Sequence, residues 1–160
     1  MPVKNDGDLI HGVGYVAVYA AYVEEAIEEV IKVILASDST ADDNILKQQV
    51  SKQIKFIKDW LKEKNLLGGQ FQGFDQYLDY VKNLMEKRNE IIHGRIYAVP
   101  GSVDILKPAR PGMPERKADS AELYDLANDL YSLLAPLNMV SMFRLAQHIR
   151  DQKKISDQSL

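Results

Sequence analysis

Apolar residues recur every three or four positions over four long stretches of the chain. In the first stretch they form one continuous row: Val13, Val16, Ala20, Val23, Ile27, Val30 and Ile34. This spacing places their side chains on one face of an α-helix, so we expect a helix over residues 8–36. Gly12 and Gly14 weaken its first turns, because glycine lowers helix propensity.

Three further stretches carry the same period. The second row consists of Leu46, Val50, Ile54, Ile57 and Leu61, the third of Phe74, Tyr77, Leu78, Val81, Leu84, Met85, Ile91 and Ile92, and the last of Leu123, Leu126, Leu130, Leu133, Leu137 and Val140. They predict helices over about residues 42–64, 74–93 and 120–149. Long amphipathic helices with short links pack as an antiparallel bundle.

Local signals predict how these helices end. Gly94 follows the third helix as a left-handed C-cap, because glycine adopts that backbone conformation cheaply. Asp119 caps the last helix, with Glu122 as its partner in a capping box. Pro136 lacks a backbone N–H group and is expected to kink the last helix.

The region between the third and last helices has a different character. Residues 95–99 and 103–106 flank Pro100-Gly101-Ser102 and predict a short hairpin, whereas residues 107–117 contain three prolines and are expected to be loop. We therefore expect an all-α fold, a four-to-five-helix antiparallel bundle with a short β-hairpin inserted after the third helix. Residues 1–150 form one domain, and residues 151–160 form a polar, frayed tail.

The composition of the chain excludes several kinds of functional site. The 160-residue chain has no cysteine, which excludes disulfides, thiolate metal sites and a cysteine nucleophile, and its net charge of −3 argues against coating nucleic acid through bulk positive charge. The most apolar run, residues 13–23, is shorter than the roughly 20 residues of a membrane span. The N-terminus lacks the basic start of a signal peptide. We expect a cytoplasmic protein without a membrane partner.

A row of basic residues accompanies the second helix. Lys47, Lys55, Lys58 and Lys62 fall within about 80° of arc on a helical wheel. One interpretation is a solvated face whose lysine stems cover apolar surface. The other is a track for nucleic-acid phosphates, and the pattern leaves both open.

The third helix carries the candidate chemistry. Arg88 falls in the middle of its apolar stripe, where a buried cation needs a partner. Glu24, at the edge of the first helix's stripe, is the expected one. Asn89 and His93 lie four residues apart and therefore on one flank. With Arg88 they can surround a small anionic group at the helix's C-terminal end, where the helix dipole favours a protonated histidine.

The segment from Met85 to Gly94 resembles the signature of the HEPN superfamily: an arginine, a polar neighbour and, a short distance on, a histidine near the end of a long helix. The resemblance implies a metal-independent ribonuclease that works as a dimer, with no metal and no cofactor. It carries over to Arg88, Asn89 and His93. Many members belong to toxin–antitoxin or phage-defence systems, so an antitoxin protein is a further possible partner.

The implied reaction divides the work between these residues. The ribose 2′-hydroxyl of RNA attacks its own phosphate, and a guanidinium such as that of Arg88 stabilises the growing negative charge. His93 transfers one proton, and Asn89 orients the phosphate or the imidazole. Since one chain offers one well-placed histidine, we expect an isologous homodimer with the third helix near the two-fold axis.

Residues around the motif are candidates for holding the RNA backbone, with Tyr97 as a base-stacking surface: Lys87, Arg95, Lys107, Arg110, Arg116 and Lys117. A solvated loop with scattered charge explains them equally well. The alternative function is a non-catalytic, HEPN-like dimeric scaffold or a nucleic-acid- or protein-binding module, in which Arg88 and Glu24 form a structural pair.

Overall fold

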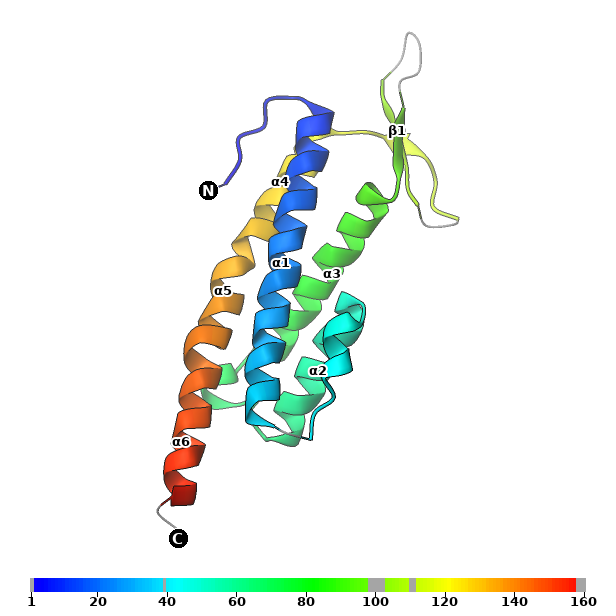
Figure 1. Ribbon diagram of the computed structural model, residues 1–160. Helices are drawn as coiled ribbons and strands as arrows, with labels where there is room; N and C mark the ends of the chain where they lie inside the picture. The colour runs from blue at the N-terminus through cyan, green and yellow to red at the C-terminus, as the bar shows by residue number, and fades with distance from the viewer. Residues whose placement is uncertain (1, 39, 98–102, 110–111, 158–160) are drawn as a thin grey trace. The chain divides into compact units, whose positions relative to one another are not determined.

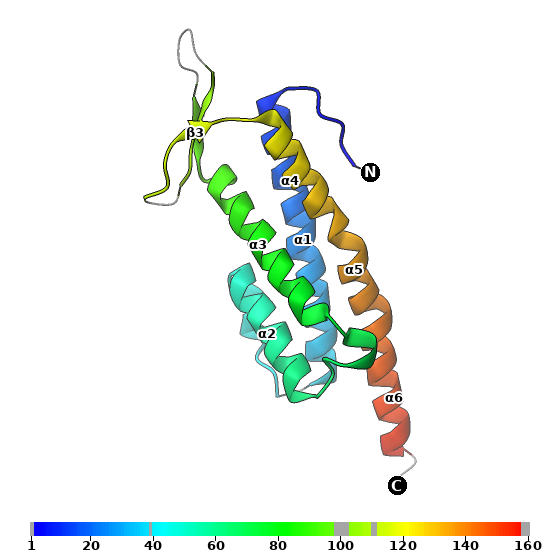
Figure 2. The same ribbon diagram turned by 180° about the vertical axis from the view of Figure 1, so that it is seen from behind.

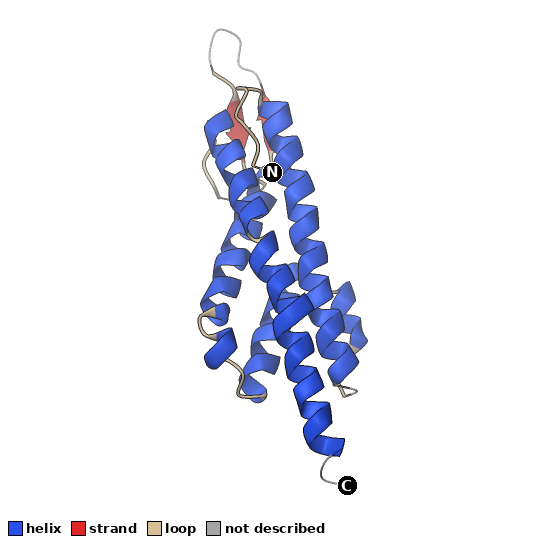
Figure 3. Ribbon diagram, turned by 90° about the vertical axis from the view of Figure 1, so that its left-hand side faces the viewer, coloured by secondary structure: helices blue, strands red, loops and turns tan. Residues whose placement is uncertain are grey.

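The structure is a computed structural model that describes residues 2–157 except 39, 98–102 and 110–111, and the side chains of these residues except Gln70 and 152–157. The chain is mostly helical (Figure 1). In the described residues, strands occur between the third and fourth α-helices (Figure 3). Among the helices described, none is long and apolar enough to cross a membrane.

The chain divides into two compact units, each assembled from two stretches of sequence. The first unit comprises Met1–Val23 and Asn83–Ser132, and the second comprises Glu24–Lys82 and Leu133–Leu160. Helix α1 (Leu9–Ser37) and helix α3 (Phe74–Ile92) contribute one end to each unit. Both helices were expected from their apolar rows within one residue of these bounds.

In the first unit, α1 and α4 (Ser120–Ser132) lie side by side (Figure 2). Gly12 makes the close approach possible, because a Cβ atom there would lie 2.8 Å from the Cβ atom of Leu123. Tyr19 and Tyr131 continue the contact with ring centroids 5.2 Å apart. The segment before α1 is also bound to α4, because the side-chain amide of Asn128 accepts a hydrogen bond from the backbone N–H of Val3 at 2.7 Å and donates one to its carbonyl at 3.1 Å.

A three-stranded antiparallel sheet follows α3 and leads into α4. Strands β1 (Arg95–Tyr97) and β2 (Ile105–Lys107) form the expected pair, with Ile96 opposite Leu106. The tip of the expected hairpin lies outside the described residues. The expectation of loop over residues 107–117 was wrong at its end, where β3 (Arg116–Lys117) pairs with β2. Leu106 is buried at the centre of this sheet, and that burial favours a third strand.

Gly94, between α3 and β1, is required for a reason other than the expected one. It is not among the described residues with a left-handed backbone, so the predicted cap was wrong. A Cβ atom at this position would lie 2.6 Å from the carbonyl oxygen of Glu90 and 2.8 Å from that of Lys107. Glycine is therefore needed for space, because β2 passes close to the end of α3.

The second unit is built around the apolar rows of α1 and α2 (Val50–Glu63), which are buried at Ile27, Val30, Ile31, Ile34, Ile54, Ile57 and Leu61. The expected helix over residues 42–64 was wrong in its first turns. Asp42 caps a short 3-10 helix, η1 (Asp43–Lys47), and the chain is extended at Gln48 before α2 begins. The buried amide of Gln53 donates to the carbonyls of Ile45 and Leu46 at 3.4 and 3.3 Å, which stabilises this break. A second 3-10 helix, η2 (Gly69–Phe71), precedes α3.

The last predicted helix is divided into several pieces. After α4 and Leu133 the chain continues as α5 (Leu134–Met139), the π-helix η3 (Val140–Leu145) and α6 (Ala146–Asp157). Pro136 cannot donate to the carbonyl four residues earlier, which accounts for an interruption at this point. Helix α6 extends to Asp157, so the expected frayed tail is helical over most of its length.

The start of α4 confirms half of the predicted capping box. The Asp119 carboxylate accepts a hydrogen bond from the backbone N–H of Ala121 at 2.9 Å, as an N-cap does. Glu122 does not complete the box. Its two carboxylate oxygens accept hydrogen bonds from the guanidinium of Arg116 on β3, which fastens the sheet to α4.

Candidate active site

The C-terminal end of α3 borders an open hollow of about 360 Å³ within the first unit. Asn89 and His93 line it together with Glu86, Glu90 and Ala109. Glu86, Asn89 and Glu90 of α3 and His93 just after it share this wall, because steps of three and four positions return to the same face of a helix. Both Asn89 and His93 are exposed, so two of the three motif residues open into one space.

Arg88 occupies a different position from the other two. It is half-buried with its Nε atom enclosed, and among the described residues it does not line the hollow. Its Nη1 atom donates a hydrogen bond to Oδ1 of Asn89 at 2.8 Å. The structure therefore brings Arg88 to the site through Asn89, whose amide orientation it fixes.

Glu24, the expected partner of Arg88, lies on α1 in the second unit, whereas Arg88 lies in the first. Because the two residues belong to different units, the Arg88–Glu24 pair remains a prediction from the sequence.

Glu86 and Glu90 are site residues that the motif did not indicate. Glu90 precedes His93 by three positions and is half-buried, while Glu86 precedes it by seven and is exposed. The spacing alone identifies them, since residues three and seven positions away lie on the face of the helix that carries His93. The hollow thus combines one imidazole, one amide and two carboxylates.

Two of the residues expected to hold RNA, Lys107 and Tyr97, contact the Glu115 carboxylate instead. Glu115 accepts a hydrogen bond from the Tyr97 hydroxyl and lies 3.1 Å from Lys107 Nζ. These contacts hold the pKa of Glu115 below its ordinary value and raise that of Tyr97. Arg95 and Lys87 are exposed, and Arg110 lies outside the described residues.

Arg116 is another of the cations expected at the rim. Its pairing with Glu122, with a smaller contribution from the nearby Glu90 carboxylate, raises its pKa above the ordinary value. Its guanidinium is committed to Glu122 at the start of α4. Arg116 therefore stabilises the sheet and adds positive potential beside Glu90.

The lysines of the second predicted helix do not form a continuous track. Lys47 lies in η1 rather than on α2. Lys55 pairs with Asp59, and Lys58 donates to both carboxylate oxygens of Asp79 on α3 at 2.7 Å. These carboxylates neutralise the two central lysines, which favours the interpretation as a solvated face.

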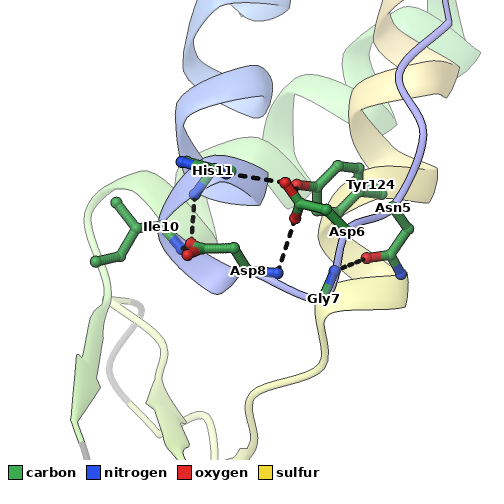
Figure 4. Close-up of polar contacts among 7 residues, drawn as sticks. All are labelled: Asn5, Asp6, Gly7, Asp8, Ile10, His11 and Tyr124. Atoms are coloured by element: carbon green, nitrogen blue, oxygen red, sulfur yellow. Dashed lines mark hydrogen bonds and ion pairs between the residues drawn. The ribbon is translucent and has the colours of Figure 1, made fainter.

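A second polar cluster joins the segment before α1 to α4 (Figure 4). Asp6 lies between His11 and Tyr124: its Oδ2 atom is 2.9 Å from His11 Nδ1, and its Oδ1 atom accepts from the Tyr124 hydroxyl at 2.6 Å. The Tyr124 and His11 hydrogen bonds hold the Asp6 pKa well below its ordinary value, and Asp6 in turn raises the pKa of His11. Burial, with Asp6 nearby, raises the pKa of Tyr124 to about 12.

Asp8 adds the helix cap to this cluster. Its carboxylate accepts from the backbone N–H groups of Ile10 and His11 at 2.7 and 2.9 Å (Figure 4). No sequence pattern indicated this arrangement, because Tyr124 is more than a hundred positions away from Asp6 and its neighbours.

Comparison of the chain with protein-family models, curated proteins and solved structures finds no match. Within the described residues, no group of three or more His, Asp or Glu side chains is placed to hold a metal ion. The resemblance to the HEPN superfamily stays a prediction from the sequence.

Proposed function

We propose that this protein is a metal-independent endoribonuclease whose reaction takes place in the hollow at the end of α3. The observation that carries the proposal is the shared hollow of Asn89 and His93, the two exposed residues of the motif. An imidazole and a carboxylate beside one open space supply the two proton-transfer groups that cleavage by the ribose 2′-hydroxyl requires.

In this proposal His93 and Glu90 divide the proton transfers. Glu90 accepts the proton of the attacking 2′-hydroxyl, and His93 donates a proton to the departing 5′-oxygen. Glu90 is the better-placed of the two carboxylates, because it lies one helical turn from His93 whereas Glu86 lies two turns away. Asn89 presents its amide N–H group to a phosphoryl oxygen, with its orientation fixed by Arg88.

A carboxylate in the same chain replaces the second histidine that the motif alone required. The sequence suggested two copies of His93 in one cleft at a dimer axis. Glu90 supports a site that one chain completes, since it is half-buried on the wall of the hollow that His93 lines. RNA is the proposed substrate in both arrangements, and the toxin–antitoxin setting with an antitoxin partner stays an inference from the resemblance.

The test is the chemistry of the products. Cleavage by this route leaves a 2′,3′-cyclic or 3′-phosphate on one fragment and a 5′-hydroxyl on the other, and a substrate with a 2′-deoxyribose at the cleaved position is resistant. Glu90→Gln should lose cleavage, and Glu63→Gln, exposed on α2 and outside the hollow, is the matched control that should retain it. Fragments with a 5′-phosphate, or cleavage of the deoxy substrate, contradict the proposal.

A second candidate is a non-catalytic dimeric module that binds protein or nucleic acid. The pairing of Lys107 with Glu115 and of Arg116 with Glu122, which engages two cations beside the site, favours it. In that case Arg88 serves folding alone. Arg88→Ala then lowers the unfolding temperature, and no ribonuclease activity accompanies the wild-type protein through purification.

A further inference from the structure

Residues 2–7, which we call the strap, precede α1 and bind to α4 without forming a helix or a strand. The side-chain amide of Asn128 on α4 accepts a hydrogen bond from the backbone N–H of Val3 at 2.7 Å and donates one to its carbonyl at 3.1 Å. An amide that engages both backbone groups of one residue recognises main chain whatever the side chain is. Helix α4 therefore holds the strap by groups that any other non-helical segment also presents.

Three positions along the strap, a carboxylate is bound by side chains from two helices. Asp6 accepts a hydrogen bond from the Tyr124 hydroxyl of α4 at 2.6 Å and lies 2.9 Å from Nδ1 of His11 on α1 (Figure 4). The Tyr124 hydroxyl and the His11 imidazole hold the pKa of Asp6 well below its ordinary value, so this position favours an anion. Tyr124 is buried, which fixes its hydroxyl in place as a donor.

Little apolar surface holds the strap in place. Val3 is half-buried, whereas Pro2, Lys4, Asn5 and Asp6 are exposed. Hydrogen bonds of exposed groups contribute little net free energy, because water competes for them. The strap is therefore held weakly enough for another segment with the same groups to replace it.

We propose that Asn128, Tyr124 and His11 form a docking site for a non-helical segment of a partner protein, and that the strap occupies this site when the partner is absent. The partner segment presents its backbone to Asn128 and, three positions on, an aspartate to Tyr124 and His11. The strap itself shows the pattern that fits, with a small apolar residue at position 3 and a carboxylate at position 6. No part of this proposal involves RNA, so it stands without the proposed ribonuclease.

Charge sets a second requirement on the partner segment. Asp125 and Asp129 each directly follow a residue of the docking site on α4, and both are exposed. These carboxylates disfavour a segment with several acids and favour a cation between its two anchor positions. The strap has this arrangement, because Lys4 stands between its apolar and acidic anchors. The partner segment therefore carries, in order, a small apolar residue, a basic residue, any residue and an aspartate.

A partner segment can cover more of the surface than the strap does. The strap runs toward the N-terminal end of α4, because its later anchor binds one helical turn before its earlier one. Partner residues placed before the apolar anchor therefore extend toward Tyr19 and Tyr131, whose rings lie 5.2 Å apart between α1 and α4. Tyr22 packs on Tyr19 at 6.4 Å and is 50% exposed. An apolar partner residue that covers Tyr22 gives the partner an advantage over the strap.

Peptide binding to the full chain tests the docking site. The probe is a fluorescein-labelled peptide with the sequence of the strap, Pro-Val-Lys-Asn-Asp-Gly, amidated at its end, and fluorescence anisotropy measures its affinity. In wild type the tethered strap competes at a high effective concentration. In Val3→Pro/Asp6→Ala, the strap-weakened variant, proline lacks the backbone N–H and alanine lacks the carboxylate. We expect the probe to bind this variant about tenfold or more tightly than wild type.

Matched substitutions in the strap-weakened variant test each contact. Asn128→Ala should abolish probe binding, whereas Asn138→Ala, exposed on α5, should leave it unchanged. Tyr124→Phe keeps the buried ring and removes the hydroxyl, so it should weaken the probe and leave the affinity of the Asp6→Asn probe unchanged. A probe extended by Leu-Leu at its N-terminal end should bind more tightly, and Tyr22→Ala should remove that gain. Circular dichroism confirms matched folding.

Three results would each overturn the proposal: no binding of the probe to the strap-weakened variant, equal binding of the probe and its Asp6→Asn form, and probe binding that survives Asn128→Ala. A wild type that sediments as a dimer and is dissociated by the probe would also overturn it, since the site would then belong to the strap of a second copy.

Discussion

Arg88 Nη1 donates a hydrogen bond to Asn89 Oδ1 at 2.8 Å, and the two residues otherwise face different surroundings. Arg88 is half-buried, while Asn89 is exposed in the hollow beside His93. A guanidinium that occupies the amide oxygen leaves the amide nitrogen as the donor available to a substrate. The two neighbouring residues of the motif therefore act as one unit.

This coupling predicts a non-additive mutant pair. Arg88→Ala and Asn89→Ala should each lower kcat/KM for RNA, and the double variant should lose little more than the worse of the two, because each change disables the same amide. The measurement is a double-mutant cycle on cleavage rate at matched folding. Losses that multiply would show that Arg88 acts on the substrate independently of Asn89.

Glu90→Gln tests the second proton-transfer group. The change keeps the size of the side chain and removes its ability to accept a proton, so we expect kcat to fall by about 10²- to 10⁴-fold, the usual contribution of general base catalysis. Glu86→Gln, on the same wall but one turn further from His93, should change it much less. Equal losses in both variants would assign the carboxylates a merely electrostatic effect.

Gly12 and Gly14 predict opposite responses to the same substitution. Gly12→Ala places a methyl group 2.8 Å from Leu123 Cβ, and overpacking of this kind costs about 1–3 kcal/mol. Gly14→Ala meets no atom within 4 Å and should stabilise the helix by about 0.5–1 kcal/mol. Urea unfolding of each variant beside wild type measures both. Equal free-energy changes would contradict the close packing of α1 on α4.

Gly12 and Gly94 show how much of the fold the sequence was able to predict. Periodicity located α1, α3 and their buried rows, because helical spacing is a local property of the chain. From the sequence, Gly12 was expected to weaken the first turns of α1 and Gly94 to form a left-handed cap. In the structure both positions need glycine because another element passes close by. Close approach depends on tertiary packing, which no local pattern records.

The candidate site, too, could be predicted from the sequence only in part. Of the three motif residues, Asn89 and His93 share one hollow, whereas Arg88 donates a hydrogen bond to Asn89 and does not line the hollow, and the catalytic roles of all three stay predictions. The Glu115 carboxylate contacts Tyr97 and Lys107, two of the residues expected to bind RNA. Arg116 pairs with Glu122, which was expected to complete the capping box of α4. Such pairings join distant positions of the sequence, so residue type alone did not reveal them.

The contact between His11 and Asp6 predicts a pH-dependent stability. The raised pKa of His11 means that its contribution is present below the ordinary value of 6.5 and is lost as pH rises through the raised pKa. The lowered pKa of Asp6 means that its contribution is present above 3.8 and is lost well below that value. The pair therefore stabilises the fold most between about pH 4 and 6.5.

Thermal unfolding of His11→Gln beside wild type measures this effect. The difference in Tm should be largest in that interval and should decline above neutral pH. In an Asp6→Asn background the His11→Gln difference should lose its pH dependence. A difference that stays constant from pH 5 to 9 is incompatible with the contact.

The most direct measurement of the central claim is cleavage of a mixed RNA panel in excess EDTA by wild type and by His93→Gln. His93 is exposed, so the variant should fold with a stability within about 0.5 kcal/mol of wild type, and His148→Gln on α6 is the matched histidine control. The account predicts cleavage by wild type and His148→Gln and none by His93→Gln. Cleavage by all three proteins, or by none of them, would contradict it.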